Sequence, residues 1–448
     1  MINDSARKLL CEQFVKNNTI DPKLYKKHYV KRGLRNADGT GVIAGLTNIC
    51  NVHGYIVNEG EKQPIPGQLI YRGYNINDLV NNVVTENRFG FEEVVYLLLM
   101  GELPNAQELE AFKSIISENR DLPPNFFEDM ILKAPSRNIM NKMGRSVLSL
   151  YSYDENPENR SPEYEMATAI SIISKLPNIM VSAYQVKKRT FDGESMIMHP
   201  LIDNHSTAEM ILSALRPDRK FTDEEAKLLD IMLMLHAEHG GGNNSTFSCR
   251  VLTSSGTDPY SAYAAAIGSL KGPKHGGANI KVVGMHDCIK ENVKNWNDEG
   301  EVADFLRKIL RKEAYDRTGL IYGMGHAVYT LSDPRAVILK KNAKKLAKGT
   351  EFEAEFNLLE TVERLTPELF NEVKGDSKII CANVDMYSGL VYRMLGIPDD
   401  LFTPLFAVSR MAGWCAHRFE ELVTGRRIIR PAYKAVMKER PYIPLNER

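Results

Sequence analysis

The chain has 448 residues, of which 43% are hydrophobic, and its 57 basic and 57 acidic side chains leave no formal net charge. Such a chain can bury a large core and divide into two or three domains. The balanced charge argues against a protein that binds nucleic acid or an anionic membrane surface. The longest uninterrupted apolar run, Val94–Met100, is far shorter than the roughly 20 residues that cross a bilayer, so we expect no membrane partner.

The first residues and the cysteines indicate the compartment. Asp4, Glu12 and several lysines stand where a secretory signal would have an apolar core, and the arginines and serines of a transit peptide are scarce, so we expect a cytoplasmic protein. The cysteines form no C-x-x-C pair, which favours free thiols over a disulfide frame or a zinc site. They are Cys11, Cys50, Cys249, Cys288, Cys381 and Cys415.

Helical periodicity dominates the chain, so we expect a mainly α fold. Apolar residues recur at three- and four-residue intervals in Phe91–Met100, Ala106–Glu118, Ala208–Leu215, Glu224–Glu238, Val302–Lys312, Ala336–Ala347 and Pro404–Leu422. The exception lies between Ile49 and Gly73, where two β-prone runs, Val52–Val57 and Gln68–Arg72, flank a segment with two prolines and a glycine. We expect a small β-hairpin there, with the prolines in its loop.

The segment from His236 to Asn243 (HAEHGGGN) closes an apolar helix. Its two histidines, His236 and His239, are three residues apart, which is half of a zinc-binding pattern. The H-E-x-x-H spacing and a third ligand are missing, so a satisfied pair of histidines at a helix end is the preferred interpretation.

Gly272–Gly277 (GPKHGG) places His275 in a glycine-rich turn between two helical segments. Free N–H groups and the dipole of the following helix would favour a neutral imidazole there. A neutral imidazole can donate a hydrogen bond to a carbonyl oxygen on which charge develops. A packing or capping histidine is the alternative.

Gly323–Tyr329 (GMGHAVY) carries His326, and Arg335 follows nine residues later. Val328 replaces the third glycine of a dinucleotide loop, so that motif is incomplete. Small residues beside a histidine let a substrate approach the backbone, and a nearby arginine can bind a carboxylate with two hydrogen bonds. The alternative is an arginine on a solvated helix start.

Asn383–Gly389 (NVDMYSG) carries Asp385 after an apolar run. A partly desolvated carboxylate is more basic than one in water and can act as a general base. The alternative is an aspartate that caps a helix beginning near Tyr387. If the three motifs met in one cleft, two imidazoles and a carboxylate would be available for enolisation.

Together and in this order, these motifs resemble the citrate synthase family. The resemblance spans roughly residues 40 to 435, and its motifs are specific. It is carried by Tyr71–Tyr74, His239–Asn243, Gly272–Gly276, Gly323–Val328 with Arg335, Asn383–Gly389, Ser409–His417 (SRMAGWCAH) and Arg430-Pro431.

The resemblance implies condensation of acetyl-CoA with oxaloacetate and hydrolysis of the thioester to citrate and CoA, the entry step of the tricarboxylic acid cycle. Asp385 would remove the methyl proton, His275 would donate a hydrogen bond to the enolate oxygen, and His326 would polarise the ketone of oxaloacetate. The resemblance implies no metal and no other cofactor. Acetyl-CoA would be a substrate and not a cofactor. The residues expected to bind oxaloacetate are His239, Asn243, Arg335, Arg410 and Arg430.

The family also implies an architecture. A large helical domain (1–274 and 391–448) and a smaller helical domain (275–390) would close over the substrates, and Arg430 would reach the site of the partner subunit in a homodimer. Lys274, Met324 and Gly325 are the candidates for acyl-CoA contacts. The departure is Thr330, where some relatives place an arginine that meets CoA phosphate. The basic run from Lys340 to Lys348 could substitute, although such a run is usually a solvated helix face.

Three alternatives remain open. A 2-methylcitrate synthase would use propionyl-CoA, because one methylene changes binding by only about 1–3 kcal/mol. An acyl hydrolase could use His239–Gly242 as an oxyanion hole, but the chain contains no G-x-S-x-G nucleophile elbow. The third alternative is a non-catalytic paralogue that binds acyl-CoA. The presence of every proposed catalytic side chain argues against it.

Overall fold

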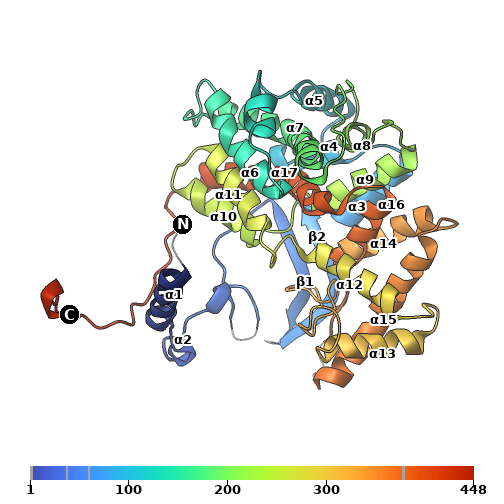
Figure 1. Ribbon diagram of the computed structural model, residues 1–448. Coiled ribbons are helices and arrows are strands. Elements are labelled where there is room, and N and C mark those ends of the chain that lie inside the picture. The colour runs from blue at the N-terminus through green and yellow to red at the C-terminus, as the bar shows by residue number, and fades with distance from the viewer. Residues whose placement is uncertain (1–3, 37–38, 59–60, 376–378) are drawn as a thin grey trace. The chain divides into compact units, whose positions relative to one another are not determined.

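The computed structural model describes residues 4–36, 39–58, 61–375 and 379–448, which divide into two units. One unit is residues 47–428, and the other combines residues 1–46 with residues 429–448 (Figure 1). The helices of the first unit are α3 (Ile76–Thr85), α4 (Phe91–Met100), α5 (Ala106–Glu118), α6 (Ile139–Leu150), α7 (Pro162–Lys187), α8 (Thr207–Leu215), α9 (Asp223–His236), α10 (Asn244–Ser254), α11 (Pro259–Leu270), α12 (Ala278–Asn292), α13 (Glu299–Leu310), α14 (Pro334–Ala347), α15 (Glu353–Lys374), α16 (Asp385–Met394) and α17 (Phe402–Thr424). Short 3-10 or π turns lie at Phe127–Leu132, Tyr151–Tyr153, Lys188–Asp192 and Asp399–Leu401. The mainly α prediction is confirmed.

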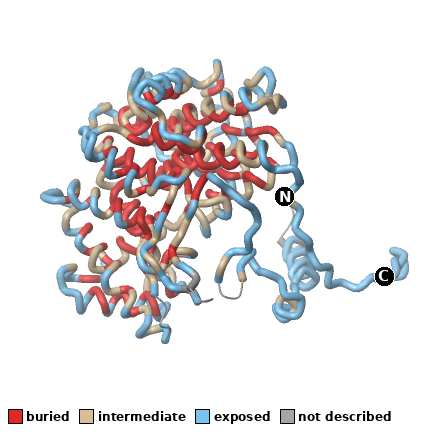
Figure 2. Tube along the Cα trace, turned by 180° about the vertical axis from the view of Figure 1, so that it is seen from behind, coloured by how far each residue is buried: buried red, intermediate tan, exposed pale blue. Residues whose placement is uncertain are grey.

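Helix α17 organises the core of this unit. It packs against α4, α6, α7, α9, α10 and α11, and it is buried on all sides from Phe402 to Leu405 and from Ala407 to Arg418. A helix that is surrounded in this way can carry polar residues only if each has a specific use. Arg410, His417 and Arg418 are fully buried on it. Figure 2 shows the buried residues running along the helices of this unit.

Helix starts follow local capping chemistry. Helices α5, α8 and α9 each begin with a capping box, in which a side-chain oxygen and a glutamate three residues later satisfy free N–H groups. The predicted bounds of α4 and α5 are those observed. The other predicted helices are confirmed with ends that differ by one to three residues, because the caps lie outside the apolar periodicity that predicted them.

The β-hairpin is confirmed, but its predicted loop is wrong. Strands β1 (Cys50–Asn58) and β2 (Glu61–Tyr71) pair antiparallel, and β3 (Tyr74–Asn75) pairs with the end of β2. Pro64 and Pro66 therefore lie inside β2. They are tolerated because β3 pairs only with the last two residues of β2, and the register shifts opposite Gly54.

The C-terminal segment of helices α12 to α16 packs largely within itself. Helix α12 packs on α16, α13 on α15, and α14 on both α15 and α16, while α14 also contacts α9, α3 and β2. The predicted small domain, 275–390, includes α12 to α15 and the first part of α16. Its boundaries stay a prediction.

The helical stretch Pro162–Asp192 is long and apolar enough to cross a membrane by length and composition, and 67% of its most apolar window is buried inside the protein. The sequence prediction considered only uninterrupted apolar runs and so did not single out this helix. A buried core helix passes the same test because polar residues scattered along it leave its mean hydropathy high.

The other unit contains α1 (Asp4–Asn18), α2 (Pro22–Lys27) and 3-10 turns at Arg32–Leu34 and Leu445–Glu447. Its described residues are nearly all exposed. All six cysteines of the chain are free thiols, and Cys11 in α1 is exposed.

Gly389 sets the spacing between α12 and α16. A β-carbon on Gly389 would lie 2.2 Å from Cγ2 of Val283, so Gly389→Ala should lower the free energy of unfolding by about 1–3 kcal/mol. Gly268 in α11 is the matched control, because no atom lies within 4 Å of an added β-carbon. Gly268→Ala should be neutral or stabilising by about 0.5–1 kcal/mol. Denaturant unfolding measures both, and equal midpoints would contradict the close packing.

Candidate active site

The second and third motifs are joined by backbone hydrogen bonds. Segments 323–325 and 381–383 form a short antiparallel bridge. The N–H of Gly325 donates to a carbonyl of the second segment at 2.7 Å, and the N–H of Asn383 donates to a carbonyl of the first at 2.8 Å. Asn383 also donates through Nδ2 to the Gly325 carbonyl at 2.9 Å. The histidine and the aspartate of the two motifs follow these segments within two residues, so the bridge brings them to one place.

His326 is held in one orientation by its own loop. Its Nδ1 accepts the backbone N–H groups of Val328 and Tyr329, both at 3.1 Å, and its ring stacks on Tyr329 with centroids 4.6 Å apart. An Nδ1 that accepts two hydrogen bonds cannot carry the proton of a neutral ring. The proton is therefore on Nε2, which is a hydrogen-bond donor.

Asp385 is the first residue of α16 and does not cap it. The oxygen that accepts its backbone N–H is Oδ1 of Asn383, at 3.0 Å, and its own carboxylate receives no recorded hydrogen bond from the described residues. The capping alternative is therefore wrong. Burial raises the pKa of Asp385 to about 6; Arg335 opposes that rise and Asp333 adds to it. Such a carboxylate is suited to act as a base near neutral pH.

His275 is held by Ser245. Its Nε2 accepts the N–H of Ser245 at 3.3 Å and lies 3.0 Å from the hydroxyl of the same residue, which accepts the indole N–H of Trp414 at 3.2 Å. The proton of a neutral ring is therefore on Nδ1. Burial, followed by the charge of Arg410, lowers the pKa of His275 to about 4. The predicted neutral state is confirmed, although its main cause is burial and not a helix dipole.

Arg335 and Arg410 are both buried, with 4% and 0% of their surface exposed. Arg335 donates through Nε and Nη2 to both oxygens of Asp333, at 3.1 and 2.7 Å, so the solvated alternative is wrong. Arg410 donates only through Nε, to the carbonyl of His236 at 2.6 Å. Its Nη1 and Nη2 are buried and have no partner among the described residues. A buried guanidinium with two unused nitrogens is a site for a carboxylate.

The expected helix-end histidine pair is wrong. Helix α9 ends at His236, whose ring packs on Phe406 at 4.4 Å, whereas His239 lies beyond the helix with its ring 5.1 Å from that of His326. The Nε2 of His239 is buried without a partner among the described residues. Burial and the nearby Arg335 lower the pKa of His239 well below its usual value, so this ring is also neutral.

The charges of the two arginines act on every part of this cluster. Arg335 perturbs the pKa of both Asp385 and His239, and Arg410 perturbs that of both His239 and His275. The residues from the three motifs therefore share one electrostatic environment.

The positions of the other predicted site residues say less about their roles. Asn243 accepts the hydroxyl of Ser245 at 2.9 Å and so borders the His275 support. Lys274 is exposed, and Met324 and Gly325 are half-buried in the bridge. Arg430 belongs to the other unit and is exposed there.

Sequence reasoning missed the supporting residues. Ser245, Asp333 and Tyr329 hold the imidazoles and the arginine; Ser245 and Asp333 each stand two residues from a recognised site residue, and Tyr329 ends the second motif. That proximity is the signal that could have found them.

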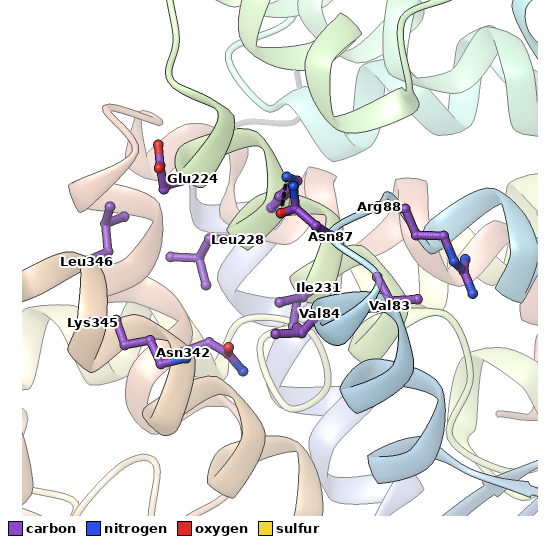
Figure 3. Close-up of a pocket in the computed structure, with 11 residues that line it drawn as sticks. Val83, Val84, Asn87, Arg88, Glu224, Leu228, Ile231, Asn342, Lys345 and Leu346 are labelled. Carbon is purple, nitrogen blue, oxygen red and sulfur yellow. Dashed lines mark hydrogen bonds between the residues drawn. The ribbon is translucent and has the colours of Figure 1, made fainter.

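An apolar groove between α3, α9 and α14 lies apart from this cluster (Figure 3). Its lining includes Val83, Leu228, Ile231 and Leu346 and none of the predicted site residues. Among the described residues, no three His, Cys, Asp or Glu side chains gather in a metal-binding group.

The fold is mainly helical, and the cluster combines a carboxyl group of raised pKa, neutral imidazoles and a buried arginine with two nitrogens that have no partner among the described residues, which is a set typical of acid–base enzymes. A sequence model of a family, described as "Citrate synthase, C-terminal domain", matches residues 36–432. The chain belongs to the citrate synthase family and is an enzyme of the citrate synthase class.

Among its relatives, a citrate synthase from Synechocystis sp. is 34% identical over 384 residues, which is 85% of this chain and 88% of that protein. The 2-methylcitrate synthase 1 of Corynebacterium glutamicum is 33% identical over 426 residues, covering 94% and 98%. Among solved structures, citrate synthase from Thermoplasma acidophilum, in a ternary complex with carboxymethyl coenzyme A and oxaloacetate, superposes with a TM-score of 0.74 and 27% identity, covering 94% of this chain and 99% of that one.

Asp385→Asn should make the protein more stable at neutral pH by about 1–3 kcal/mol. The ordinary pKa of the side chain is 3.8 and the folded value is about 6, so the folded state disfavours the ionised form. This cost is complete above pH 6 and disappears as pH falls below the ordinary value. Urea unfolding of both proteins at pH 8 and pH 4 measures it, and a stability difference independent of pH would contradict the assignment.

Proposed function

We propose that this protein condenses acetyl-CoA with oxaloacetate and hydrolyses the resulting thioester to citrate and CoA. The observation that carries the proposal is the combination of a buried arginine with two unused nitrogens, neutral imidazoles with defined protons, and a carboxyl group whose pKa is about 6. A dianionic keto acid and an enolisable thioester need these three kinds of group.

Oxaloacetate would be bound through its carboxylates and its ketone. Arg410 would offer Nη1 and Nη2 to one carboxylate. Arg335, which Asp333 holds in place, lies close enough to His239 to lower the pKa of that histidine, as Arg410 also does. His239 and Asn243 would complete the binding. The Nε2–H of His326 would donate to the ketone oxygen and make the ketone carbon more electrophilic.

The acyl donor would be activated by Asp385 and His275. The carboxylate of Asp385 takes a proton from the methyl carbon, and the Nδ1–H of His275 donates to the thioester oxygen as it becomes an enolate oxygen. A fixed donor of this kind is worth about 3 kcal/mol in the transition state. The enolate carbon then bonds to the ketone carbon, and water cleaves the thioester to release CoA.

The other features implied by the family remain part of this proposal. They are a homodimer in which Arg430 completes the site of the partner subunit, closure of a small domain over the substrates, acyl-CoA contacts from Lys274, Met324 and Gly325, and a cytoplasmic location. The ternary complex of the Thermoplasma acidophilum relative supports the two substrates. The matches to 2-methylcitrate synthases favour propionyl-CoA as the second candidate donor.

Thiol release from acetyl-CoA and from propionyl-CoA, each with and without oxaloacetate, tests the proposal. We expect release that requires oxaloacetate and a higher kcat/KM with acetyl-CoA. Asp385→Asn should lower turnover by about 100-fold or more and leave oxaloacetate affinity nearly unchanged. Release without oxaloacetate would indicate a hydrolase, and preference for propionyl-CoA would indicate a 2-methylcitrate synthase.

The pH profile tests the assignment of the base. Because the ionised form of Asp385 is the active one, kcat/KM for the acyl donor should fall as pH falls through about 6. His275 should stay neutral until pH approaches 4. A profile that is flat between pH 5 and pH 8 would show that another group removes the proton.

A further inference from the structure

His417 is fully buried on α17 between a guanidinium and a carboxylate. Its Nδ1 lies 3.1 Å from Nε and 2.8 Å from Nη2 of Arg250, and its Nε2 lies 3.0 Å from Oε1 of Glu238. A guanidinium can only donate, so Nδ1 accepts. The ring is therefore neutral and donates its single proton from Nε2 to Glu238.

Arg250 is itself held in place from the other side. Glu421 accepts its Nη1 at 2.9 Å, and Glu420 accepts its Nη2. The arginine is thus paired with two carboxylates and does not need His417 for charge balance. Its contact with His417 fixes which ring nitrogen carries the proton.

Glu238 receives this hydrogen bond at the turn that presents His239. Its Oε1 also accepts the N–H of Gly240 at 2.5 Å, and its backbone N–H and carbonyl both bond to the hydroxyl of Tyr71, at 3.3 and 2.9 Å. The Nε2–H of His417 and the N–H of Gly240 both donate to this carboxyl group, and the positive charge of Arg410 lies nearby, so the carboxylate is ionised. The residues on both sides of His239 are therefore fixed.

Helix α17 and the turn approach each other closely at Glu238. A β-carbon on Gly413 would lie 2.1 Å from Oε2 of Glu238, and one on Gly241 would lie 3.3 Å from Cε1 of His417. Two glycines thus let α17 and the turn approach closely enough for the hydrogen bond between them.

We propose that His417 is a positioning residue for oxaloacetate binding. It acts through Glu238 to hold the turn of residues 238–240, which keeps the ring of His239 against that of His326. The inference rests on the proposed function, because it assigns His239 to oxaloacetate. His417 itself touches no substrate.

A double-mutant cycle on the dissociation constant for oxaloacetate, measured by calorimetry, tests this role. His417→Met removes both hydrogen bonds and should weaken oxaloacetate binding by about tenfold or more, because Glu238 loses a buried partner. His417→Gln can accept from Arg250 and donate to Glu238, so its affinity should stay within about threefold of wild type, a loss smaller than one hydrogen bond. In a His239→Ala background, His417→Met should have no further effect.

Controls separate this role from a general loss of structure. Arg418, the next residue of α17, makes a buried contact with Glu165 of α7, so Arg418→Lys alters a different contact of the same helix and should leave oxaloacetate affinity unchanged. The KM for the acyl donor should not change in His417→Met. If that variant does not fold, Glu238→Gln replaces it in the same cycle with the same expectation.

Additive effects of the changes at His417 and His239, failure of His417→Gln to restore affinity, or an equal rise in both KM values would each overturn the proposal. If the wild-type protein binds oxaloacetate but condenses nothing, the proposed function fails while the cycle can still be read. If it does not bind oxaloacetate, both fail.

Discussion

The site depends on a positive charge buried without a counter-ion in direct contact. Arg410 has no exposed surface, and two of its nitrogens have no partner among the described residues. Burial is the main reason why the pKa values of His239 and His275 are lowered, and the charge of Arg410 adds to this effect because it disfavours a second positive charge nearby. The two imidazoles are therefore neutral, and a carboxylate of the proposed substrate would supply the counter-charge that Arg410 lacks.

Each reactive ring has its proton placed by backbone or by a fixed side chain before any substrate arrives. His326 accepts two N–H groups of its own loop, and His275 accepts the N–H of Ser245, so the opposite nitrogen of each ring is the donor. This arrangement requires no rearrangement of the donors during the reaction, which is how preorganised groups stabilise developing charge most effectively. Burial has a cost at Asp385, because it disfavours the ionised carboxylate that the proposed mechanism uses as the base.

The motifs were predictable because their chemistry is local. Each motif sets one acid or base among small or turn-forming residues within six or seven positions. This pattern singles out His275, His326 and Asp385 as candidates without knowledge of the packing. The burial of Arg335 was not predictable, because the sequence places Asp333 two residues away but only the fold shows that the pair lies in the core. The prolines of β2 misled the hairpin prediction, because their tolerance depends on which strand edge is unpaired. Arg430 lies in a separate unit, and the role proposed for it concerns a second subunit, which the sequence of one chain cannot place.

The hairpin also has a mechanical consequence. Gly67 in β2 donates its N–H to the carbonyl of Ser332 at 3.1 Å, and a β-carbon on Gly54 would strike the carbonyl of Val328. A strand from the first fifth of the chain is thus tethered to the loop that follows His326. Any rotation of that loop must either carry these parts of β1 and β2 with it or break this tether, so the hairpin and the loop are mechanically coupled.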